Sequence, residues 1–346
     1  MSLLFLAAAV GLALLLQRAA VARDAEQLRI SHRAGRLLVE SGESFPLEVT
    51  VENPGRRFVP FLRVEEQQIF PMEGAAEKDG VYRRSFSLWL RPRQRLTRSI
   101  RATLPQRGRY VLWDLSLYSG DFLGLEEKKT RCGGFAEVVA APKALPSPAL
   151  TKVLGGFLGD VSARRFILED PVLTLGYREY TGREPMKMIS WSQSARGRGL
   201  MVKKQDYTLE PSVAVLLNTE TAEPEREEAL ERCFSLCRSV CEVLEKQGVK
   251  YSFLSNAAVA GGVKGSAEGL GQRHFYGILE ELGRATYSRR MTLEELLEKE
   301  SRRQSSAGRI LITPGGETFH SPAFHRLRES AAGQVLILRG TEAALW

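Results

Sequence analysis

The sequence predicts a multidomain protein with an N-terminal transmembrane helix, a β-sandwich of immunoglobulin-like type and a doubly wound α/β domain. An uncharged apolar run occupies positions 3–16, apolar and polar residues alternate between about 28 and 142, and short apolar runs alternate with helical patterns after 211. A chain of 346 residues is also too long for one ordinary core. We therefore expect four segments, at 1–23, 28–142, 143–210 and 211–346.

The apolar run Leu3–Leu16 is the candidate transmembrane helix. It is shorter than the roughly 20 residues that span a bilayer. The run reaches that length when it is extended to Ser2 at one end and Ala22 at the other, with the Arg18 side chain directed toward the membrane–water interface. Arginines follow the run instead of preceding it, which argues against a secretory signal peptide. By the positive-inside rule they predict a single-pass protein of the cell membrane, with the bulk of the chain cytoplasmic.

Positive charge is concentrated in the first two thirds of the chain. Lys and Arg outnumber Asp and Glu by 21 to 16 in residues 1–142 and by 11 to 7 in residues 143–210, whereas residues 211–346 carry 17 against 18. This distribution suits a surface that faces the anionic headgroups of a membrane. We expect no nucleic-acid partner, because the sequence has no basic helix with interleaved aromatic residues and no recognised binding motif.

The cysteines favour a reduced, cytoplasmic protein. Cys233, Cys237 and Cys241 recur every four residues within a helical pattern, and Cys132 stands apart from them. Zinc sites usually need a two-residue gap and a second pair of ligands, and the sequence has neither. We therefore expect free thiols buried along one face of a helix, with no bound metal and no cofactor.

Residues 28–142 show the pattern of short antiparallel strands. Phe45, Leu47, Val49 and Val51 occupy every second position, which is the period of a half-buried strand. The turn signal Asn53-Pro54-Gly55 ends this strand. Further strands are expected at Phe61–Glu65, Tyr82–Leu90, Thr97–Thr103 and Tyr110–Tyr118. Short strands separated by turn residues predict a sandwich, which we interpret as a spacer or a protein-binding module.

Residues 211–346 alternate between strand and helix patterns. Val213–Leu217 is an apolar run typical of a buried parallel strand. An amphipathic helix is expected at about 224–247, with acidic residues at its start and Gly248 after its end. The remaining expected elements are strands at Val249–Leu254, Arg309–Ile312 and Gln334–Leu338 and helices at Arg273–Leu282 and Leu293–Arg303. This alternation predicts the doubly wound parallel sheet.

The most distinctive passage follows a proline-rich linker at 141–148. It reads Tyr177-Arg178-Glu179-Tyr180-Thr181-Gly182, then Ile189-Ser190-Trp191-Ser192-Gln193-Ser194-Ala195-Arg196, then Leu200-Met201-Val202-Lys203. It contains no histidine, no nucleophile elbow and no base beside its serines, so catalysis is not predicted. We interpret it as a structural or partner-binding segment. The candidate binding residues are Arg178, Glu179, Tyr180, Trp191, Ser194 and Arg196.

Trp191 is the central residue of this passage. It follows the apolar residues Met188 and Ile189. That pattern predicts that Trp191 is buried between the β-rich and α/β parts of the chain, where a large aromatic side chain contributes strongly to packing.

The same passage resembles the signature of the domain-of-unknown-function 58 family, which runs R-E-Y-x-x-G-D, I-x-W-x-x-S-A-R and L-x-V-(K/R). Upstream, Arg107–Tyr110 and Gly120–Leu125 resemble that family's R-G-R-Y and D-P-F-G-L elements. The resemblance covers most of the chain. Two positions depart from it: Arg183 stands at the acidic position, and Lys187-Met188 replaces the arginine that precedes the isoleucine.

The resemblance implies that the C-terminal domain is similar to a von Willebrand factor type A module. In such modules a D-x-S-x-S sequence at the end of the first strand binds magnesium through an aspartate and two hydroxyls. In this sequence the three positions are Asn218, Glu220 and Ala222. Because the ligands have changed in kind, we expect a degenerate site without specific metal binding.

The resemblance also implies a partner, a MoxR-type AAA+ ATPase, and a role in assembling or remodelling other proteins. Since the sequence lacks a catalytic constellation, we expect a membrane-anchored, non-enzymatic scaffold or adaptor. Two alternatives are a metal-dependent adhesion or sensor module and an envelope-associated enzyme. A preserved magnesium site would favour the first alternative. A pocket uniting Glu179, Arg196 and Asp206 would favour the second.

Overall fold

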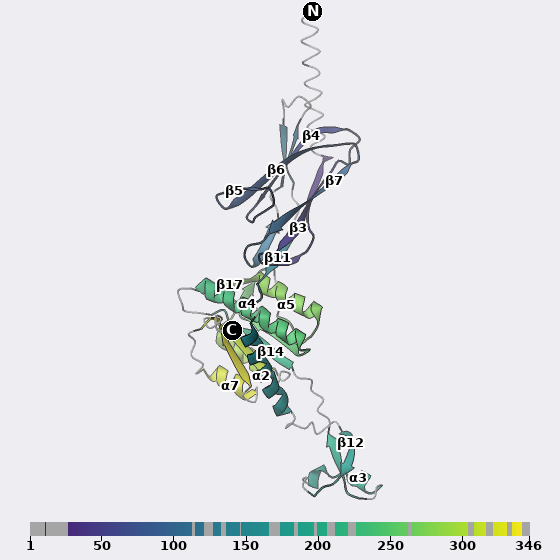
Figure 1. Cartoon of the computed structure of the whole chain (residues 1–346), viewed down its shortest axis with the longest axis vertical. Helices are drawn as coiled ribbons and strands as arrows, with labels where there is room; N and C mark the ends of the chain where they lie inside the picture. Colours follow the sequence, from purple (N-terminus) through teal and green to yellow (C-terminus); the bar gives the residue numbers. More distant parts are fainter. Residues whose placement is uncertain are drawn as a thin grey trace, which may run out of the picture. The chain divides into compact units, whose positions relative to one another are not determined.

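The computed structural model describes residues 11, 27–112, 115–120, 127–132, 136–145, 147–165, 174–182, 186–196, 199–205, 212–220, 226–261, 265–303, 308–315, 321–330 and 334–340 (Figure 1). The chain divides into two compact units. One comprises Met1–Lys143 together with Leu282–Arg284, and the other comprises Ala144–Glu281 and Ala285–Trp346. We call them the β-rich unit and the α/β unit.

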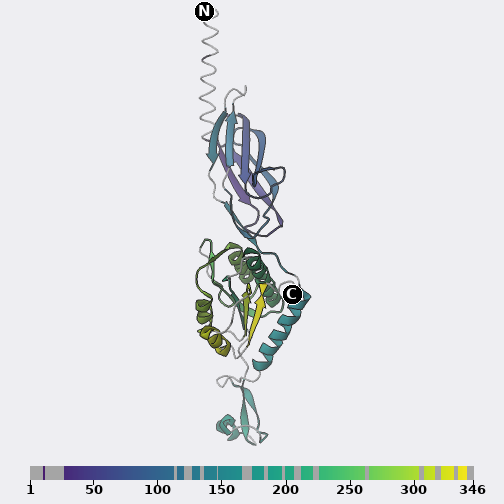
Figure 2. The same cartoon turned by 90° about the vertical axis from the view of Figure 1, so that its left-hand side faces the viewer.

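The β-rich unit consists of three sheets. One has the strand order β1-β3-β7, one β10-β9-β4-β6-β5 and one β2-β11-β8. The strands are β1 (Arg29–Ala34), β2 (Leu38–Glu40), β3 (Ser44–Glu52), β4 (Val59–Gln68), β5 (Ala76–Lys78), β6 (Val81–Leu90), β7 (Arg95–Thr103), β8 (Gly108–Leu112), β9 (Leu115–Gly120), β10 (Glu127–Cys132) and β11 (Ala136–Ala141). Alternate residues of β3 and β4 point into the space between the sheets, so the unit is layered as a sandwich (Figure 2).

The interior of the β-rich unit contains two apolar clusters. The first includes Leu62 and Val64 of β4, and the second includes Phe70 and Met72, which follow β4 in the sequence. Glu66 and Gln68 occupy the buried positions between them. His32 of β1 approaches from the facing sheet, with 4.0 Å between its Nε2 and Oε1 of Glu66. A buried polar layer therefore interrupts the apolar core.

Burial sets the charges of this layer. It lowers the pKa of His32 to about 4, because the low-dielectric interior disfavours the imidazolium. Burial also raises the pKa of Glu66, although the nearby guanidinium groups of Arg84 and Arg98 lower it. The histidine is consequently neutral near pH 7.

We expect the β-rich unit to lose stability as the pH falls from about 6.5 to about 4, because of His32. The pKa of His32 is lower in the folded protein, so the unfolded chain binds the proton first. The shift from 6.5 to about 4 corresponds to roughly 3 kcal/mol of unfolding free energy. Urea titrations of the wild type and of His32→Gln across this pH range measure the effect. The same pH dependence in both proteins would contradict it.

The α/β unit is built on a parallel sheet of four strands in the order β15-β14-β18-β19. These strands are β14 (Ser212–Leu217), β15 (Lys250–Ser255), β18 (Gly308–Thr313) and β19 (Val335–Arg339). All residues of β14 and β18 are buried, as expected for central strands covered on both faces. An antiparallel pair, β16 (Ala257–Val259) and β17 (Ala285–Arg289), forms a separate ribbon.

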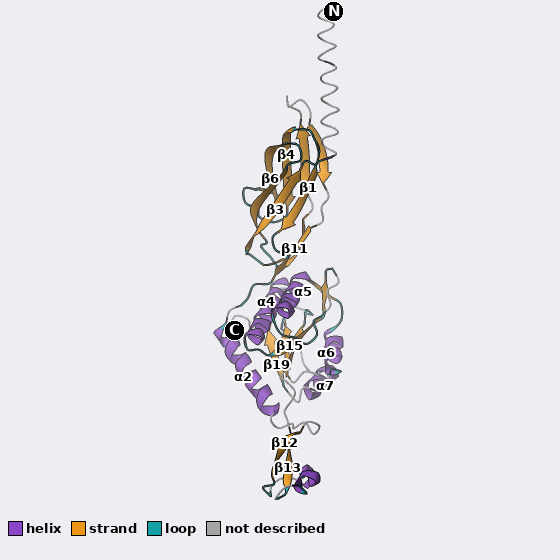
Figure 3. Cartoon of the chain, turned by 90° about the vertical axis from the view of Figure 1, so that its right-hand side faces the viewer, coloured by secondary structure: helices purple, strands orange, loops and turns teal. Residues whose placement is uncertain are grey.

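Helices cover both faces of this sheet. On one face, α6 (Leu293–Ser301) and α7 (Pro322–Ser330) pack against Ala214, Leu216 and Leu311. On the other face, α4 (Arg226–Lys246) packs against β14, β15 and β18, and α2 (Pro148–Arg165) approaches the start of β18 (Figure 3). A further helix in the described part of the chain is α5 (Gln272–Arg284).

The buried helix face of α4 carries the predicted free thiols. Cys233, Cys237 and Cys241 are all fully buried and unbridged, which confirms the prediction for these three residues. Burial raises the pKa of the Cys237 thiol, and the neighbouring Cys241 thiol adds to this effect. The side chain of Cys132 lies outside the part of the structure that is described.

The predicted fold class was wrong. Among the residues that the structure describes, strand exceeds helix, 44% against 30%. The C-terminal unit combines its four parallel strands with separate antiparallel ribbons, and it is not a von Willebrand factor type A module. The helical and strand periods of the sequence predict individual elements. They do not specify how many strands join one sheet, or which strands form separate antiparallel pairs.

The predicted single-pass membrane localisation was also wrong. Within the described ranges, no helix is both long and apolar enough to cross a membrane. The longest helices, α2 and α4, have 18 and 21 residues, but each contains several charged side chains. The apolar run Leu3–Leu16, on which the prediction depended, lies outside the described residues except for Gly11.

Candidate functional site

The distinctive central passage folds into a small module of its own, which we call the signature module (174–205). Its two antiparallel strands are β12 (Thr174–Glu179) and β13 (Met201–Gln205). Between them lie a 3-10 turn, η1 (Met186–Met188), and the short helix α3 (Trp191–Ser194). Ile189 forms an isolated bridge with Val202, and both side chains are buried. The small core that they form holds the η1–α3 segment against one face of the strands.

Ser194 fixes the backbone of this module. Its hydroxyl donates a hydrogen bond to the carbonyl of Ser190 at 2.8 Å and accepts one from the N–H of Met201 at 2.8 Å. The N–H of Ser190 donates to the carbonyl of Met201, also at 2.8 Å. One serine side chain thus connects α3 to β13. Its half-buried position and its two bonds indicate a structural role for this candidate binding residue.

Trp191 is 61% exposed, so the prediction that it is buried was wrong. Ile189 and Ser190 are the buried residues, and Trp191 follows them as the first residue of α3. Three further large apolar side chains of the module are exposed: Tyr177 at 41%, Met186 at 69% and Leu200 at 43%. Exposed apolar side chains gathered in one small module indicate a contact surface.

The charged candidates lie on the surface of the same module. Arg178, Glu179 and Arg196 are all exposed, and Tyr180 is half-buried. Arg178 Nη1 lies 3.5 Å from the carbonyl of Glu179, a long and weak contact. Glu179 and Arg196 are open to solvent, and Asp206 lies outside the described residues. The module as a whole carries seven Lys and Arg against two Glu, a net charge of +5.

The strands of the signature module present two different faces. In the antiparallel register Tyr177 lies opposite Lys203, and Arg178 lies opposite Val202. The face of Tyr177 and Lys203 is exposed, whereas the face of Val202 is covered by the η1–α3 segment. An aromatic side chain and a basic side chain therefore lie next to each other on the open face.

The predicted degenerate metal site is an amide network at the carboxyl ends of β14, β15 and β18. Asn218 Oδ1 accepts hydrogen bonds from Asn256 Nδ2 at 2.7 Å and from the N–H of Glu220 at 2.9 Å, and Asn218 Nδ2 donates to Thr313 Oγ1 at 3.1 Å. Asn256 Oδ1 accepts from the N–H and the hydroxyl of Thr219 at 2.8 and 3.0 Å. All four of the residues Asn218, Thr219, Asn256 and Thr313 are fully buried.

Glu220, the second position of the predicted site, is directed elsewhere. Its carboxylate pairs with Arg289 and accepts the N–H of Leu293 at 2.9 Å, at the start of α6. A carboxylate is favourable there because the first N–H groups of a helix lack partners. The third position, Ala222, lies outside the described residues. Asn218 thus connects the ends of the strands, and Glu220 connects them to the start of α6, in both cases through bonds to other groups of the protein.

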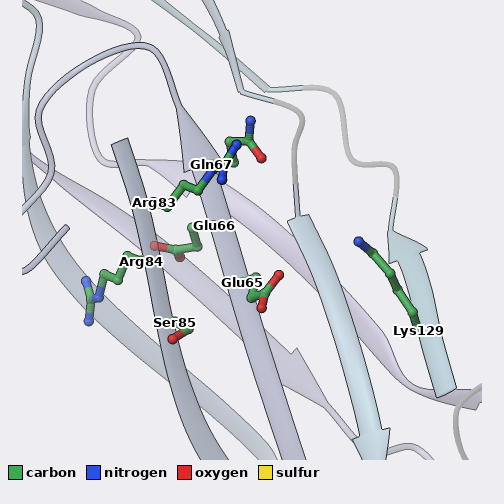
Figure 4. A pocket seen from close by; sticks show the side chains of 7 residues that line it. All are labelled: Glu65, Glu66, Gln67, Arg83, Arg84, Ser85 and Lys129. Atoms are coloured by element: carbon green, nitrogen blue, oxygen red, sulfur yellow. The ribbon is translucent and has the colours of Figure 1, made fainter. Parts of the chain in front are cut away.

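A shallow groove of about 440 Å³ lies on the five-stranded sheet of the β-rich unit (Figure 4). It is lined by Glu65, Glu66, Gln67, Arg83, Arg84, Ser85 and Lys129. Strand alternation directs the Glu66 side chain to the interior, away from Glu65 and Gln67. The remaining lining carries both signs of charge and is open to solvent, so it does not define a ligand. We regard the signature module as the better candidate site.

Comparison with known proteins gives little further information. No protein-family model matches the chain, and no curated protein matches it. Among solved structures, the CARDB domain of a Pyrococcus furiosus protein in complex with di-metal ions has 17% identity, covering 33% of this chain and 86% of that one, with a TM-score of 0.24. The sporulation control protein Spo0M of Bacillus subtilis has 13% identity, covering 44% and 58%, with a TM-score of 0.20. Such low TM-scores carry no argument about fold or function.

Proposed function

We propose that this protein is a non-enzymatic adaptor that binds another protein through its signature module. The observation that carries the proposal is the exposure of Tyr177, Met186, Trp191 and Leu200 within one small, basic module. Leaving four large apolar side chains in water is unfavourable, and a partner that covers them gains that free energy on binding.

The composition of this surface favours a protein partner. Tryptophan, tyrosine, methionine and arginine are enriched at protein–protein interfaces, and Trp191 and Arg196 are of the types that dominate binding energy. The net charge of +5 selects an acidic partner surface and accelerates the encounter with it. The bonds of Ser194 hold the backbone in place, so little conformational entropy is lost when the partner binds.

The identity of the partner is proposed from the sequence resemblance. The signature is similar to that of the domain-of-unknown-function 58 family, whose members are associated with MoxR-type AAA+ ATPases. We therefore take such an ATPase as the partner, and protein assembly or remodelling as the process. The signature module would then be the surface through which the adaptor binds the ATPase.

The variant Trp191→Ala should lose partner binding without losing stability. Truncation of a central interface tryptophan typically costs about 2 kcal/mol or more, which is about a thirtyfold loss of affinity. Because the side chain is 61% exposed, the melting temperature should stay nearly unchanged. The experiment captures partners on the tagged full-length chain, identifies them by mass spectrometry and then titrates the purified ATPase.

The control is Tyr276→Ala, which removes an exposed aromatic side chain from α5. It should leave the affinity for the ATPase at the wild-type value. If wild-type protein does not retain a MoxR-type ATPase, the proposed partner is wrong. If Trp191→Ala lowers the melting temperature and the affinity together, the residue is structural and the proposed contact is wrong.

A further inference from the structure

Two loops of the β-rich unit are fixed against each other. Residues 53–58 connect β3 to β4, and residues 91–94 connect β6 to β7. Asn53 is buried, and its Nδ2 donates to the carbonyls of Arg57 at 2.8 Å and Arg91 at 3.0 Å. The N–H of Arg93 in turn donates to the carbonyl of Gly55 at 3.0 Å. The side chains of both loops therefore belong to one rigid surface.

Basic and aromatic side chains cover this surface, which we call the arginine face: Arg56, Arg57, Phe58, Trp89, Arg91 and Arg93. Its four arginines are exposed, and the two loops contain no Asp or Glu. Glu52, which precedes the first loop, already pairs with Arg95 at 2.9 Å. The positive charge of the face is thus uncompensated by its own loops and is available to an anionic group.

Arg93 occupies a backbone conformation that arginine disfavours. Its φ is +57°, and the N–H of Gln94 bonds to the carbonyl of Arg91 at 3.2 Å across the turn that Pro92 and Arg93 form. A turn with positive φ at its third residue normally contains glycine or asparagine there. Keeping an arginine at this position costs stability. Strained residues concentrate at functional sites, so the strain independently points to a role for the Arg93 side chain.

The aromatic pair at the centre of the face determines which ligand fits. Phe58 is 43% exposed and Trp89 is 51% exposed, with 5.9 Å between their ring centroids, and the Arg91 guanidinium lies 5.6 Å above the Trp89 ring. A stacked nucleobase covers a whole ring face, and Arg91 and Phe58 already lie against Trp89, whereas a single apolar side chain needs only part of the exposed rings. Insertion into lipid would need apolar side chains at a loop tip, whereas Trp89 belongs to strand β6.

We propose that the arginine face binds an acidic segment of a protein. The guanidinium groups of Arg91 and Arg93 engage carboxylates, which match the planar fork of their N–H donors. One apolar side chain of the segment packs on the platform of Phe58 and Trp89. This surface lies in the β-rich unit and is separate from the signature module. It gives the adaptor a second, independent contact.

The test uses the full-length chain and a fluorescent synthetic peptide rich in Asp and Glu with one central Phe. We expect the wild type to bind the peptide and Arg93→Gly to bind it at least about tenfold more weakly. Because glycine adopts positive φ without strain, the melting temperature of Arg93→Gly should not fall. A loss of binding without a loss of stability is the result that identifies a ligand-binding arginine.

Two control variants complete the design. Asp79→Gly replaces another residue with positive φ, at +55°, outside the arginine face, and Arg33→Ser removes one exposed positive charge from β1. Both should bind the peptide as the wild type does, and so should Trp191→Ala, since the signature module is not involved. The proposal is overturned if the peptide does not bind, if Arg93→Gly binds it normally, or if an oligothymidylate or phosphatidylserine vesicles bind more tightly than the peptide through the same arginines.

Discussion

Replacement of Arg309 by methionine should destabilise the α/β unit by about 3 kcal/mol, the lower end of what is lost when one partner of a buried ion pair is removed. Arg309 and Glu300 are 1% and 0% exposed, with 3.8 Å between Nε and Oε1. Burial raises the pKa of Glu300, and the cations Arg309 and Arg303 lower it. Without Arg309, the Glu300 carboxylate stays buried with only Arg303, 3.6 Å away, to compensate it. Thermal and urea unfolding measure the loss.

Two further measurements separate this electrostatic effect from a packing effect. The pKa of Glu300 is raised in the folded state, so the deficit of Arg309→Met should grow as the pH rises above the ordinary value of 4.5 and shrink below it. The double variant Arg309→Met/Glu300→Leu removes both charges and should recover most of the lost stability. A deficit that is independent of pH and persists in the double variant would show that the volume of Arg309 matters, and not its charge.

Replacement of Asn256 by alanine should cost the α/β unit about 3 kcal/mol or more, because it removes the acceptor or donor of several buried polar groups. The N–H and hydroxyl of Thr219 lose their acceptor, and Oδ1 of Asn218 loses one of its two donors and keeps the N–H of Glu220. In a unit of this size such a loss corresponds to a decrease of roughly 6–12 °C in melting temperature.

The amide network can be tested as one cooperative unit. Asn218→Ala breaks the same network from its other side, since Asn218 also contacts Thr313. If the two asparagines stabilise the strand ends jointly, the double variant should be much less destabilised than the sum of the single variants. Additive losses would mean that each asparagine acts alone.

Local periodicity predicted many of the elements. The alternation from Phe45 to Val51 lies within β3, and the apolar run Val213–Leu217 lies within β14. The helix expected at about 224–247 corresponds to α4 at Arg226–Lys246. These patterns are reliable because burial of one face or both faces acts directly on neighbouring residues of the same element.

The assembly of those elements was predicted less well. An apolar run shorter than the length that spans a bilayer predicted a transmembrane helix. The alternation of strand and helix patterns predicted a domain of the von Willebrand factor type A kind. Both predictions were wrong. Sheet membership depends on pairings between segments far apart in the chain. β14, for example, pairs with both β15 and β18, and only the first is its neighbour in the sequence.

The candidate site was also predicted only in part. The sequence identified the passage that forms the signature module. The apolar residues before Trp191 predicted that it is buried, but burial ends one residue earlier, at Ser190. The arginine face was missed altogether. The turn at Asn53-Pro54-Gly55 was predicted, but the arginines of the two loops come together through bonds between the loops, those of Asn53 and of the Arg93 N–H among them.

The edges of the five-stranded sheet have a consequence for how this protein behaves at high concentration. One edge strand, β10, is a run of mostly charged residues, and the other, β5, has only three residues, all exposed. Unpaired strand edges otherwise recruit further strands, the first step toward aggregation, and short or charged edges oppose this. Crowding against other copies of the protein should therefore not extend this five-stranded sheet. A partner that docks on this sheet must be recognised through side chains, because neither edge strand presents a long, uncharged backbone.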